Sequence, residues 1–137
     1  MANSVPKVTA TSTRTPGRYL LSARYNHFAS DATDARGGLG EAIGAAELYL
    51  SALATCGLAL ITEAARRDNI DDSSFGAEAS YSVDPSDKTR FEWVELIFTL
   101  PGLDPRLAED LVASFTNVCP IYNTVARDTT VTVKTRT

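Results

Sequence analysis

Apolar residues dominate one long stretch near the middle of the chain. Between Ala42 and Thr62 the only charged residue is Glu47, and most other positions are Ala or Leu. The stretch is long enough to span a bilayer, but it contains scattered Ser, Thr and Gly residues, and a glutamate inside lipid would be costly. We therefore predict a helix that is buried on nearly all sides within a globular protein, and not a membrane span.

The segments that precede this helix have the pattern of strands. Residues 7–15 are rich in Thr and Val, and a Pro-Gly pair separates them from residues 18–25, which predicts a hairpin. Residues 26–32 predict a short third strand. The glycine-rich residues 34–44 contain no phosphate-binding motif, and we interpret them as a flexible connector into the helix.

The second half of the chain predicts two strands, two helices and a final strand. Residues 75–83 alternate between apolar and polar side chains, and residues 91–100 predict a more fully buried strand, so the two form another hairpin. Asp104 can cap a helix that begins with the proline after it. A short helix is predicted from Pro120 to about Ala126, followed by a last strand over residues 129–135.

This order of elements predicts the fold class. Strands, a long helix, two strands, helices and a strand indicate an α+β domain, with helices packed on one side of a mainly antiparallel sheet. The length of 137 residues suits a single domain over residues 1–137.

Composition narrows the classes of function. The formal net charge is −4 and the basic residues form no block, so nothing favours a nucleic-acid partner or an anionic membrane surface. The first eight residues show no apolar segment of a secretory signal, and we expect a cytoplasmic protein with reduced thiols. Two cysteines and one histidine do not complete a zinc site, so we expect neither a metal nor a cofactor.

The two cysteines occupy distinct positions. Cys56 lies in the middle of the apolar helix, where it is either a small buried apolar residue or a functional thiol. Cys119 precedes Pro120, which places it at the N-cap of the short helix, where backbone N–H groups would favour a thiolate. One thiol inside a helix and one at a helix start are the parts of a dithiol redox pair, although the sequence alone does not show that they meet.

Two stretches carry a resemblance to a known family. The first is ASDATDARGGLGEAIGAAELYLSALATCGLAL, which contains Cys56, and the second is VCPIYNTVARDTTVTV, which contains Cys119. In this order they resemble the signatures of the OsmC/Ohr family of thiol peroxidases, the osmotically inducible and organic-hydroperoxide-resistance proteins. The resemblance extends over nearly the whole chain from about Arg18 onward.

The resemblance implies a fold, an assembly and a reaction. It implies an intertwined homodimer with shared sheets, in which sheet and partner bury the long helices. It implies that Cys56 is the peroxidatic thiolate, that Cys119 resolves it as a disulfide, and that an external dithiol reduces this disulfide. The substrate would be an organic hydroperoxide. The helix-start argument favours Cys119 as the more acidic thiol, and on this point we follow the resemblance.

The resemblance also implies an arginine from the N-terminal strands that lowers the pKa of the attacking thiol. The candidates in this chain are Arg14, Arg18 and Arg24, and Arg24 in ARYNHFASD matches the pattern of relatives best.

In relatives a glutamate near the helix start pairs with the arginine, usually ten residues before the cysteine. Here Ala46 holds that position, and Glu47 lies nine residues before Cys56. Nine residues place Glu47 on the opposite helix face, about 13 Å along the axis. Glu47 can therefore act only across the dimer interface, or by holding an arginine of the other subunit.

Two other functions remain open on the sequence. The same fold can carry a disulfide reductase or a redox regulator, and a dimer that binds a small ligand or lipid would use both cysteines only for packing. The acidity of the thiols separates these classes, because a binding module would leave both cysteines unreactive at neutral pH.

Overall fold

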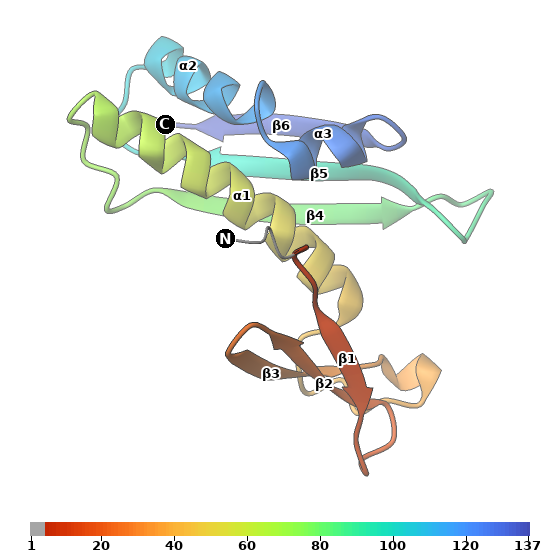
Figure 1. Cartoon of the computed structure of the whole chain (residues 1–137). Coiled ribbons are helices and arrows are strands. Elements are labelled where there is room, and N and C mark those ends of the chain that lie inside the picture. Colours follow the sequence, from red (N-terminus) through yellow and green to blue (C-terminus); the bar gives the residue numbers. More distant parts are fainter. Residues whose placement is uncertain (1–4) are drawn as a thin grey trace. The chain divides into compact units, whose positions relative to one another are not determined.

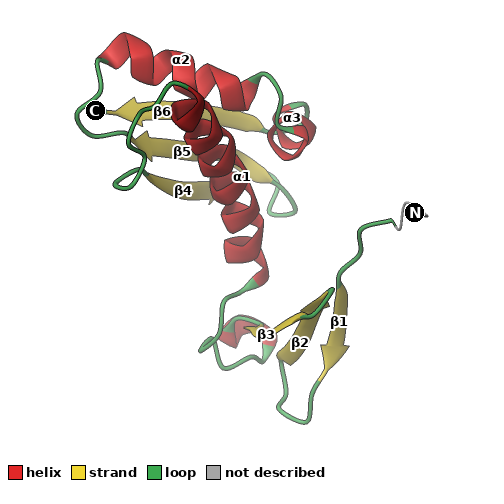
Figure 2. Cartoon of the chain, turned by 60° about the vertical axis from the view of Figure 1, so that its left-hand side comes forward, coloured by secondary structure: helices red, strands yellow, loops and turns green. Residues whose placement is uncertain are grey.

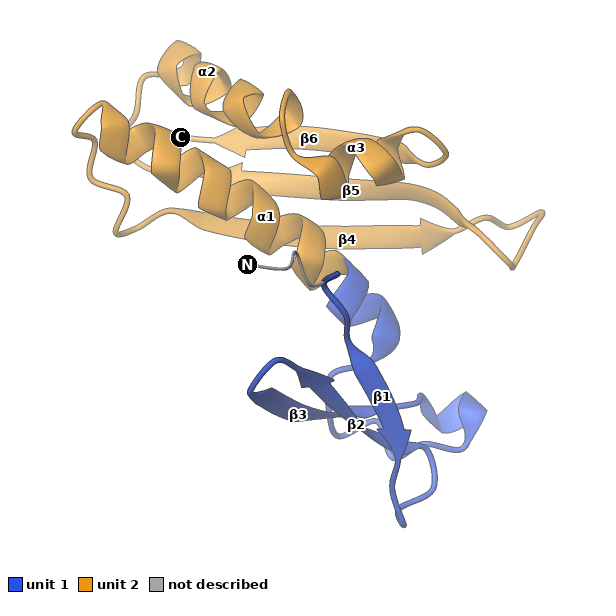
Figure 3. Ribbon diagram, in the orientation of Figure 1, with its two compact units in different colours: residues 1–49 blue, residues 50–137 orange. Residues whose placement is uncertain are grey.

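A computed structural model describes residues 5–137 and divides the chain into two compact units. One unit reaches to Tyr49 and the other runs from Leu50 to Thr137 (Figure 3). Three strands, a long helix, two strands, two helices and a last strand follow one another, so the predicted order and the α+β class are confirmed (Figure 1). The single domain expected over residues 1–137 stays a prediction.

The first unit contains a three-stranded antiparallel sheet in the order β1-β2-β3. Arg18 at the start of β2 pairs with Asp31 at the end of β3. Gly17 supplies the left-handed conformation, with a φ of 72°, that the turn before β2 requires. The bounds are β1 Thr9–Ser12, β2 Arg18–Ala23 and β3 Asn26–Asp31.

The glycine-rich segment after β3 is largely exposed but makes close backbone contacts with the hairpin, and its interpretation as a flexible connector stays a prediction. It opens with a 3-10 helix, η1 Asp34–Arg36. Gly38 then passes so close to Ala32 that a β-carbon on Gly38 would overlap the Ala32 carbonyl. The Ala32 amide in turn donates to the Gly17 carbonyl at 2.7 Å. These contacts tie the loop to the hairpin.

The second unit contains a sheet in the order β4-β5-β6. Strands β4 and β5 form the predicted antiparallel hairpin, whereas β6 runs parallel to β5. The prediction of one mainly antiparallel sheet was therefore wrong in part, because two helices between β5 and β6 carry the chain back to the starting end of the sheet. The bounds are β4 Gly76–Val83, β5 Phe91–Thr99 and β6 Thr130–Arg136.

Three helices lie on one face of this sheet (Figures 1 and 2). The helix α2 begins as predicted, because the Asp104 side chain accepts hydrogen bonds from the amides of Arg106 and Leu107. The helix α1 ends near Asn69, which takes the expected left-handed conformation with a φ of 57°. The bounds are α1 Ala45–Arg67, α2 Pro105–Thr116 and α3 Pro120–Ala126.

The core of this unit lies between the sheet and the helices. Alternate residues of β5 face it, and β5 is more buried than β4, in which no residue is buried, so the expectation of a more fully buried strand is confirmed. The fully buried side chains include Val94, Leu96 and Phe98 from β5, Leu53 and Ile61 from α1, and Phe115 from α2.

The long helix α1 buries one face in the single chain, so burial on nearly all sides is not observed. Leu53, Gly57 and Ile61 face the core, while Ala52 and Ala59 are exposed. Only 17% of its most apolar 18-residue window is buried. The helix is long and apolar enough to cross a membrane, a property that it shares with core helices of soluble proteins.

Candidate functional site

The two cysteines meet within the second unit. Cys56 lies in the middle of α1 and Cys119 lies at the junction of α2 and α3, and their Sγ atoms are 2.6 Å apart. Both are free thiols in this structure. A disulfide joins sulfurs at about 2.05 Å, so a small shift of either side chain completes the bond. The structure thus brings together two residues that the sequence separates by 62 others.

Cys119 occupies the predicted helix start. It is the N-cap of α3 with Pro120 at the first helical position, and its Sγ accepts a hydrogen bond from the Tyr122 amide at 3.4 Å. Its side chain is fully buried. The N-cap geometry therefore fixes where this sulfur points, and the chain around it excludes water.

Asn123 holds the turn in which Cys119 lies. Its Nδ2 donates to the carbonyl of Thr116, the last residue of α2, at 3.2 Å, and to the carbonyl of Cys119 at 2.8 Å. The Thr116 carbonyl is one of the groups at a helix end that have no partner within the helix. A single amide thus links the end of α2 to the start of α3, on either side of the thiol.

Gly57 allows α1 to approach the sheet beside the thiol pair. A β-carbon at this position would overlap Cζ of Phe98 and would lie 2.8 Å from its Cε1 and 3.4 Å from Cε1 of Phe115. The Phe115 ring also packs edge-to-face against Phe98 and Tyr122, with centroids 5.4 Å and 5.0 Å apart. An aromatic cluster of the core therefore packs against Gly57, the neighbour of Cys56, and includes Tyr122 from the helix that Cys119 caps.

The environment of Cys56 favours its thiol form. Burial, followed by the hydrogen bond with Cys119, raises the pKa of Cys56 to about 11. At neutral pH a thiol with this pKa is ionised in about 1 molecule in 10,000. A positive charge beside Cys56 would lower this pKa, because it would stabilise the thiolate.

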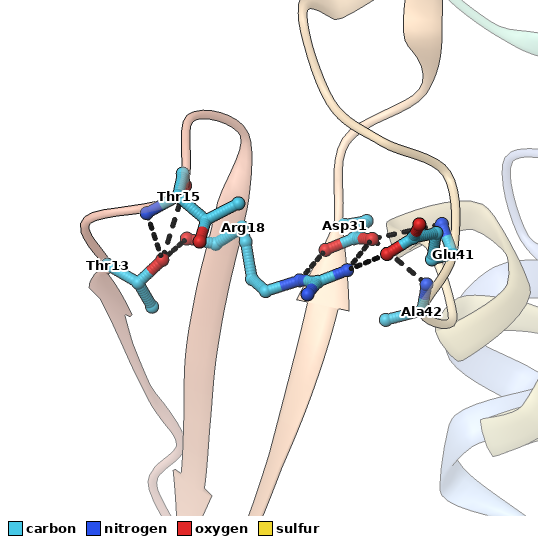
Figure 4. A network of polar contacts seen from close by, with 6 residues as sticks. All are labelled: Thr13, Thr15, Arg18, Asp31, Glu41 and Ala42. Carbon is cyan, nitrogen blue, oxygen red and sulfur yellow. Dashed lines mark hydrogen bonds and ion pairs between the residues drawn. The ribbon is translucent and has the colours of Figure 1, made fainter.

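Arg18 lies at the centre of a polar network in the first unit (Figure 4). Its Nε and Nη2 donate to the two carboxylate oxygens of Asp31 at 2.7 and 2.8 Å, and Nη2 also donates to Glu41 at 2.9 Å. The amides of Glu41 and Ala42 donate to Asp31 Oδ2, each at 3.0 Å. The Arg18 guanidinium holds the pKa of Asp31 well below its usual range, and the two carboxylates raise the pKa of Arg18.

The other predicted site residues lie at ends and turns of the first unit. Arg24 follows β2 in a two-residue turn with a φ of 57°, and the structure records no hydrogen bond or ion pair of its side chain among residues 5–137. Arg14 is exposed in the loop between β1 and β2. Glu47 lies in the first turn of α1, where its carboxylate accepts a hydrogen bond from the Gly44 amide at 2.7 Å.

Several residues of this region were missed by the sequence reasoning. Asn123 and Asp31 carry no local signal, because their partners lie on other elements. Gly57 does carry a signal, since a glycine inside a helical pattern lowers helix stability and implies a packing reason. In the part of the chain that the structure describes, no three His, Cys, Asp or Glu side chains converge in a way that could hold a metal ion.

Comparisons with known proteins agree with this geometry. Residues 38–134 match the model of a family described as OsmC-like protein. No curated protein matches the sequence at a significant level.

Several solved structures share the fold over nearly the full length of both chains. A candidate osmotic stress induced and detoxification response protein from Psychrobacter arcticus is 24% identical, with a TM-score of 0.82 and coverage of 99% of this chain and 98% of that chain. An organic hydroperoxide resistance protein OsmC from Legionella pneumophila, also described as a predicted redox protein, is 21% identical, with a TM-score of 0.76 and full coverage of both chains. An organic hydroperoxide resistance protein from Elizabethkingia anophelis is 18% identical, with a TM-score of 0.77 and 99% coverage of each chain.

Proposed function

The chain belongs to the OsmC-like family, and we propose that it is a thiol-dependent peroxidase that reduces organic hydroperoxides. The observation that carries this proposal is the 2.6 Å separation of the Cys56 and Cys119 sulfurs. Cys56 is the attacking residue, because it is the more accessible of the two thiols. Cys119 is the resolving residue.

The reaction proceeds in two steps at these sulfurs. The Cys56 thiolate attacks the distal oxygen of the hydroperoxide, the O–O bond breaks, and the alcohol leaves after taking up a proton. Cys56 is then a sulfenic acid. The Cys119 sulfur attacks it, the S–O bond breaks, water leaves, and a Cys56–Cys119 disulfide remains. An external dithiol returns the pair to the reduced state.

A guanidinium activates Cys56 in this proposal, and Arg24 is our candidate. The charge of Arg18 is already balanced by Asp31 and Glu41, which makes it a weaker source of positive potential. Glu47 takes the role of a carboxylate that holds the arginine of another subunit. Both assignments follow from the family resemblance.

The substrate class follows from the family resemblance. The aromatic core cluster of Phe98, Phe115 and Tyr122 gives the thiol pair apolar surroundings, in keeping with an organic hydroperoxide. The relatives from Legionella pneumophila and Elizabethkingia anophelis are described as organic hydroperoxide resistance proteins, which supports the same class.

A homodimer completes the proposal. The exposed Ala and half-buried Leu residues of α1 form an apolar surface, and β4 and β6 each have a strand neighbour on one side only among the described residues. A second copy that covers α1 and extends the sheets would satisfy both features. We place this dimer in the cytoplasm, where a reduced thiol pair persists.

Mass spectrometry after addition of one equivalent of cumene hydroperoxide tests the function. The wild-type protein should lose two hydrogens as the disulfide forms. Cys56→Ser should remain unchanged, while Cys119→Ser should react once and then bind dimedone at Cys56 as a sulfenic acid. Dimedone on Cys119 of the Cys56→Ser protein, with none on Cys56 of the reverse variant, would exchange the two roles.

A disulfide reductase or redox regulator is the second candidate, because the adjacent sulfurs of Cys56 and Cys119 suit a dithiol–disulfide couple as well as a peroxidase. Both reactions need a thiolate, so the two functions are separated by the substrate that the thiol pair accepts. Fast exchange with a model disulfide together with no reaction toward cumene hydroperoxide would select this function. No reaction of either kind would favour the ligand-binding dimer.

A further inference from the structure

The thiol pair offers two sulfur ligands and no others. The sulfurs of Cys56 and Cys119 are 2.6 Å apart, both cysteines are free thiols, and Cys119 is fully buried. Among residues 5–137, no third His, Cys, Asp or Glu side chain joins them in a way that could hold a metal ion. The pair therefore suits a ligand that needs only two sulfurs from the protein.

We propose that the reduced pair is a binding site for trivalent arsenicals, in which the arsenic atom of an organoarsenous acid bridges Cys56 and Cys119. Such a molecule carries one organic group and two hydroxyl groups on arsenic. Its binding uses the reduced thiols and needs no peroxide chemistry, so it is separate from the proposed peroxidase reaction.

The short distance between the sulfurs favours arsenic over the soft metal ions. Ions such as Cu(I) prefer thiolate ligands, and two ligands bound in line lie two bond lengths apart. For bonds as long as a Zn–S bond of about 2.3 Å, that separation is about 4.6 Å. Trivalent arsenic is pyramidal and its bonds meet near a right angle, so bonds of the same length hold the sulfurs about 3.3 Å apart. From 2.6 Å the pair must open by about 0.7 Å for arsenic and by about 2 Å for a linear ion.

The larger opening would disturb the packing around the pair. The Cys119 sulfur is held at the N-cap of α3, where it accepts a hydrogen bond from the Tyr122 amide. Gly57, next to Cys56, packs against the Phe98 ring, so a movement of α1 away from the sheet would leave a cavity in the core. The smaller opening is within the range of a small χ1 rotation of Cys56.

The protonation of the pair points to the same ligand. Burial raises the pKa of Cys56 to about 11, so this thiol keeps its proton at neutral pH. A metal ion binds thiolates, so it must first displace the proton into water. A hydroxyl group on arsenic takes up the thiol proton itself and leaves as water. The bridged product is neutral, so no charge is buried beside Cys119.

Two exchanges build the bridge. In the first, the Cys56 sulfur forms a bond to arsenic, one As–O bond breaks, and the hydroxyl leaves as water with the thiol proton. In the second, the Cys119 sulfur replaces the other hydroxyl in the same way. Arsenic stays trivalent and neither sulfur is oxidised. Because the second exchange is intramolecular, the bridge should bind at least about 100-fold more tightly than a single thiol does.

Phenylarsine oxide, which water converts to phenylarsonous acid, is the probe. It is similar in size to cumene hydroperoxide, so in the proposed dimer it can use the path that the hydroperoxide needs to reach Cys56. Native mass spectrometry of the reduced full-length protein should show one added phenylarsenic group per chain and the loss of two hydrogens. Protein oxidised with diamide, which forms the disulfide without peroxide, should bind none.

Single-thiol variants test the bridge. Cys56→Ser and Cys119→Ser should each bind phenylarsine oxide at least about 100-fold more weakly than the wild-type protein. Serine is a favoured N-cap residue, so Cys119→Ser should keep the start of α3, and urea unfolding checks that both variants are folded. Equal binding by the wild type and either folded variant would overturn the proposal, as would an adduct that forms only after denaturation.

Zinc tests the choice of ligand, and hydroperoxide separates this site from the proposed function. Zinc needs four ligands, so it should bind the wild-type protein no more tightly than Cys119→Ser. Zinc that binds the wild type as tightly as phenylarsine oxide would overturn the preference for arsenic. A protein that is inert to cumene hydroperoxide but binds phenylarsine oxide through both cysteines would lose the proposed peroxidase activity and keep the arsenical site.

Discussion

Gly57 of α1 lies directly against the ring of Phe98 of β5, with no room for a β-carbon between them. This contact sets how closely α1 approaches the sheet, and the neighbouring residue on α1 is Cys56. Because Cys119 is held by a different part of the same unit, the Gly57–Phe98 contact also sets the distance between the two sulfurs.

We expect Gly57→Ala to move the thiols apart. Alanine favours a helix over glycine by about 1 kcal/mol, but an added methyl group in a packed core costs about 1–3 kcal/mol, so the free energy of unfolding should fall by about 1 kcal/mol. Diamide-driven disulfide formation should slow by about tenfold or more, because a shift of about 1 Å is large for a reacting pair. Urea unfolding and the rate of disulfide formation measure the two effects.

Ala59→Gly is the matched control. It places the opposite change on the exposed side of the same helix, where it should lower stability by about 1 kcal/mol and leave the rate of disulfide formation unchanged. If both variants form the disulfide at the wild-type rate, Gly57 does not set the sulfur separation.

The pH dependence of Cys56 alkylation tests the proposed arginine. Without a nearby cation, burial and Cys119 hold the pKa of Cys56 at about 11, so the thiolate appears only above neutral pH. We expect the Cys56 thiol of Arg24→Ala to ionise only above neutral pH. In the wild-type protein the same thiol should ionise at lower pH, because a guanidinium stabilises the thiolate. Rates of iodoacetamide labelling between pH 6 and about 11.5, read on the Cys56 peptide, give both curves.

Arg14→Ala serves as the control for this comparison, since it removes a charge from another exposed loop of the same unit. Identical curves for the wild type and Arg24→Ala would exclude Arg24 and direct attention to Arg18.

The network around Asp31 should make the stability of the fold depend on pH in the acid range. The pKa of Asp31 is lower in the folded chain than in the unfolded chain, chiefly because of its hydrogen bonds with Arg18. The unfolded state therefore binds the proton more tightly, so this contribution to stability is complete above about pH 4 and is lost as the pH falls below that value.

Thermal unfolding of Asp31→Asn tests this contribution. The variant should have a lower Tm than the wild type at pH 7, and its Tm should fall less steeply as the pH is lowered. The exposed change Glu41→Gln should alter the Tm less. An unchanged acid profile in Asp31→Asn would show that this carboxylate contributes no pH-linked stability.

The elements were predictable because their signals are local. The start of α3 at Pro120 and the cap at Asp104 follow from residues that are adjacent in the chain, and the structure confirms both. The alternation over residues 75–83 also predicted the strand β4 and its hairpin with β5. Caps, turns and periodicity act within a few residues, so one sequence contains them in full.

The rest depends on contacts between distant segments. Neither the parallel pairing of β6 with β5 nor the close approach of Gly57 to Phe98 leaves a complete local pattern. The partner of Cys56 came from the family resemblance, since composition cannot bring two cysteines together. The exposure of α1 was missed because an apolar helix predicts that its surface is buried, but it does not show whether the same chain or a second copy buries that surface.

A charge on the exposed side of α1 should separate the proposed dimer. In multi-angle light scattering at micromolar concentration, the wild-type protein should show twice the chain mass of 14.7 kDa. Ala52→Glu places an unpaired carboxylate on the surface that the second copy would cover, so it should give a monomer or raise the dissociation constant by at least about 100-fold. Lys88→Glu in the exposed loop before β5 should remain a dimer. A wild-type protein that is monomeric and unfolds cooperatively would contradict the assembly.

Removal of the Asn123 side chain should slow disulfide formation without slowing the reaction of Cys56 with the hydroperoxide. Asn123 bonds to the carbonyls of Thr116 and Cys119 and does not reach the attacking sulfur, so Asn123→Ala should leave the reaction of Cys56 with cumene hydroperoxide at its wild-type rate. The turn around Cys119 would loosen, and disulfide formation should slow by about tenfold, since a misplaced resolving thiol lowers the fraction of reactive encounters. The sulfenic acid would then persist, and more of it would be oxidised to the sulfinic acid. Stopped-flow kinetics with dimedone trapping measures the two steps in one protein.

Two further variants separate positioning from simple destabilisation. Thr124→Ala, at the next position of α3, alters an exposed side chain and should preserve both rates. Asn123→Gln keeps the amide on a longer side chain and should restore part of the second rate if its N–H groups reach the same carbonyls. If Asn123→Ala slows both steps equally, its effect is a general loss of structure. If it slows neither, the bridge between α2 and α3 does not position the resolving thiol.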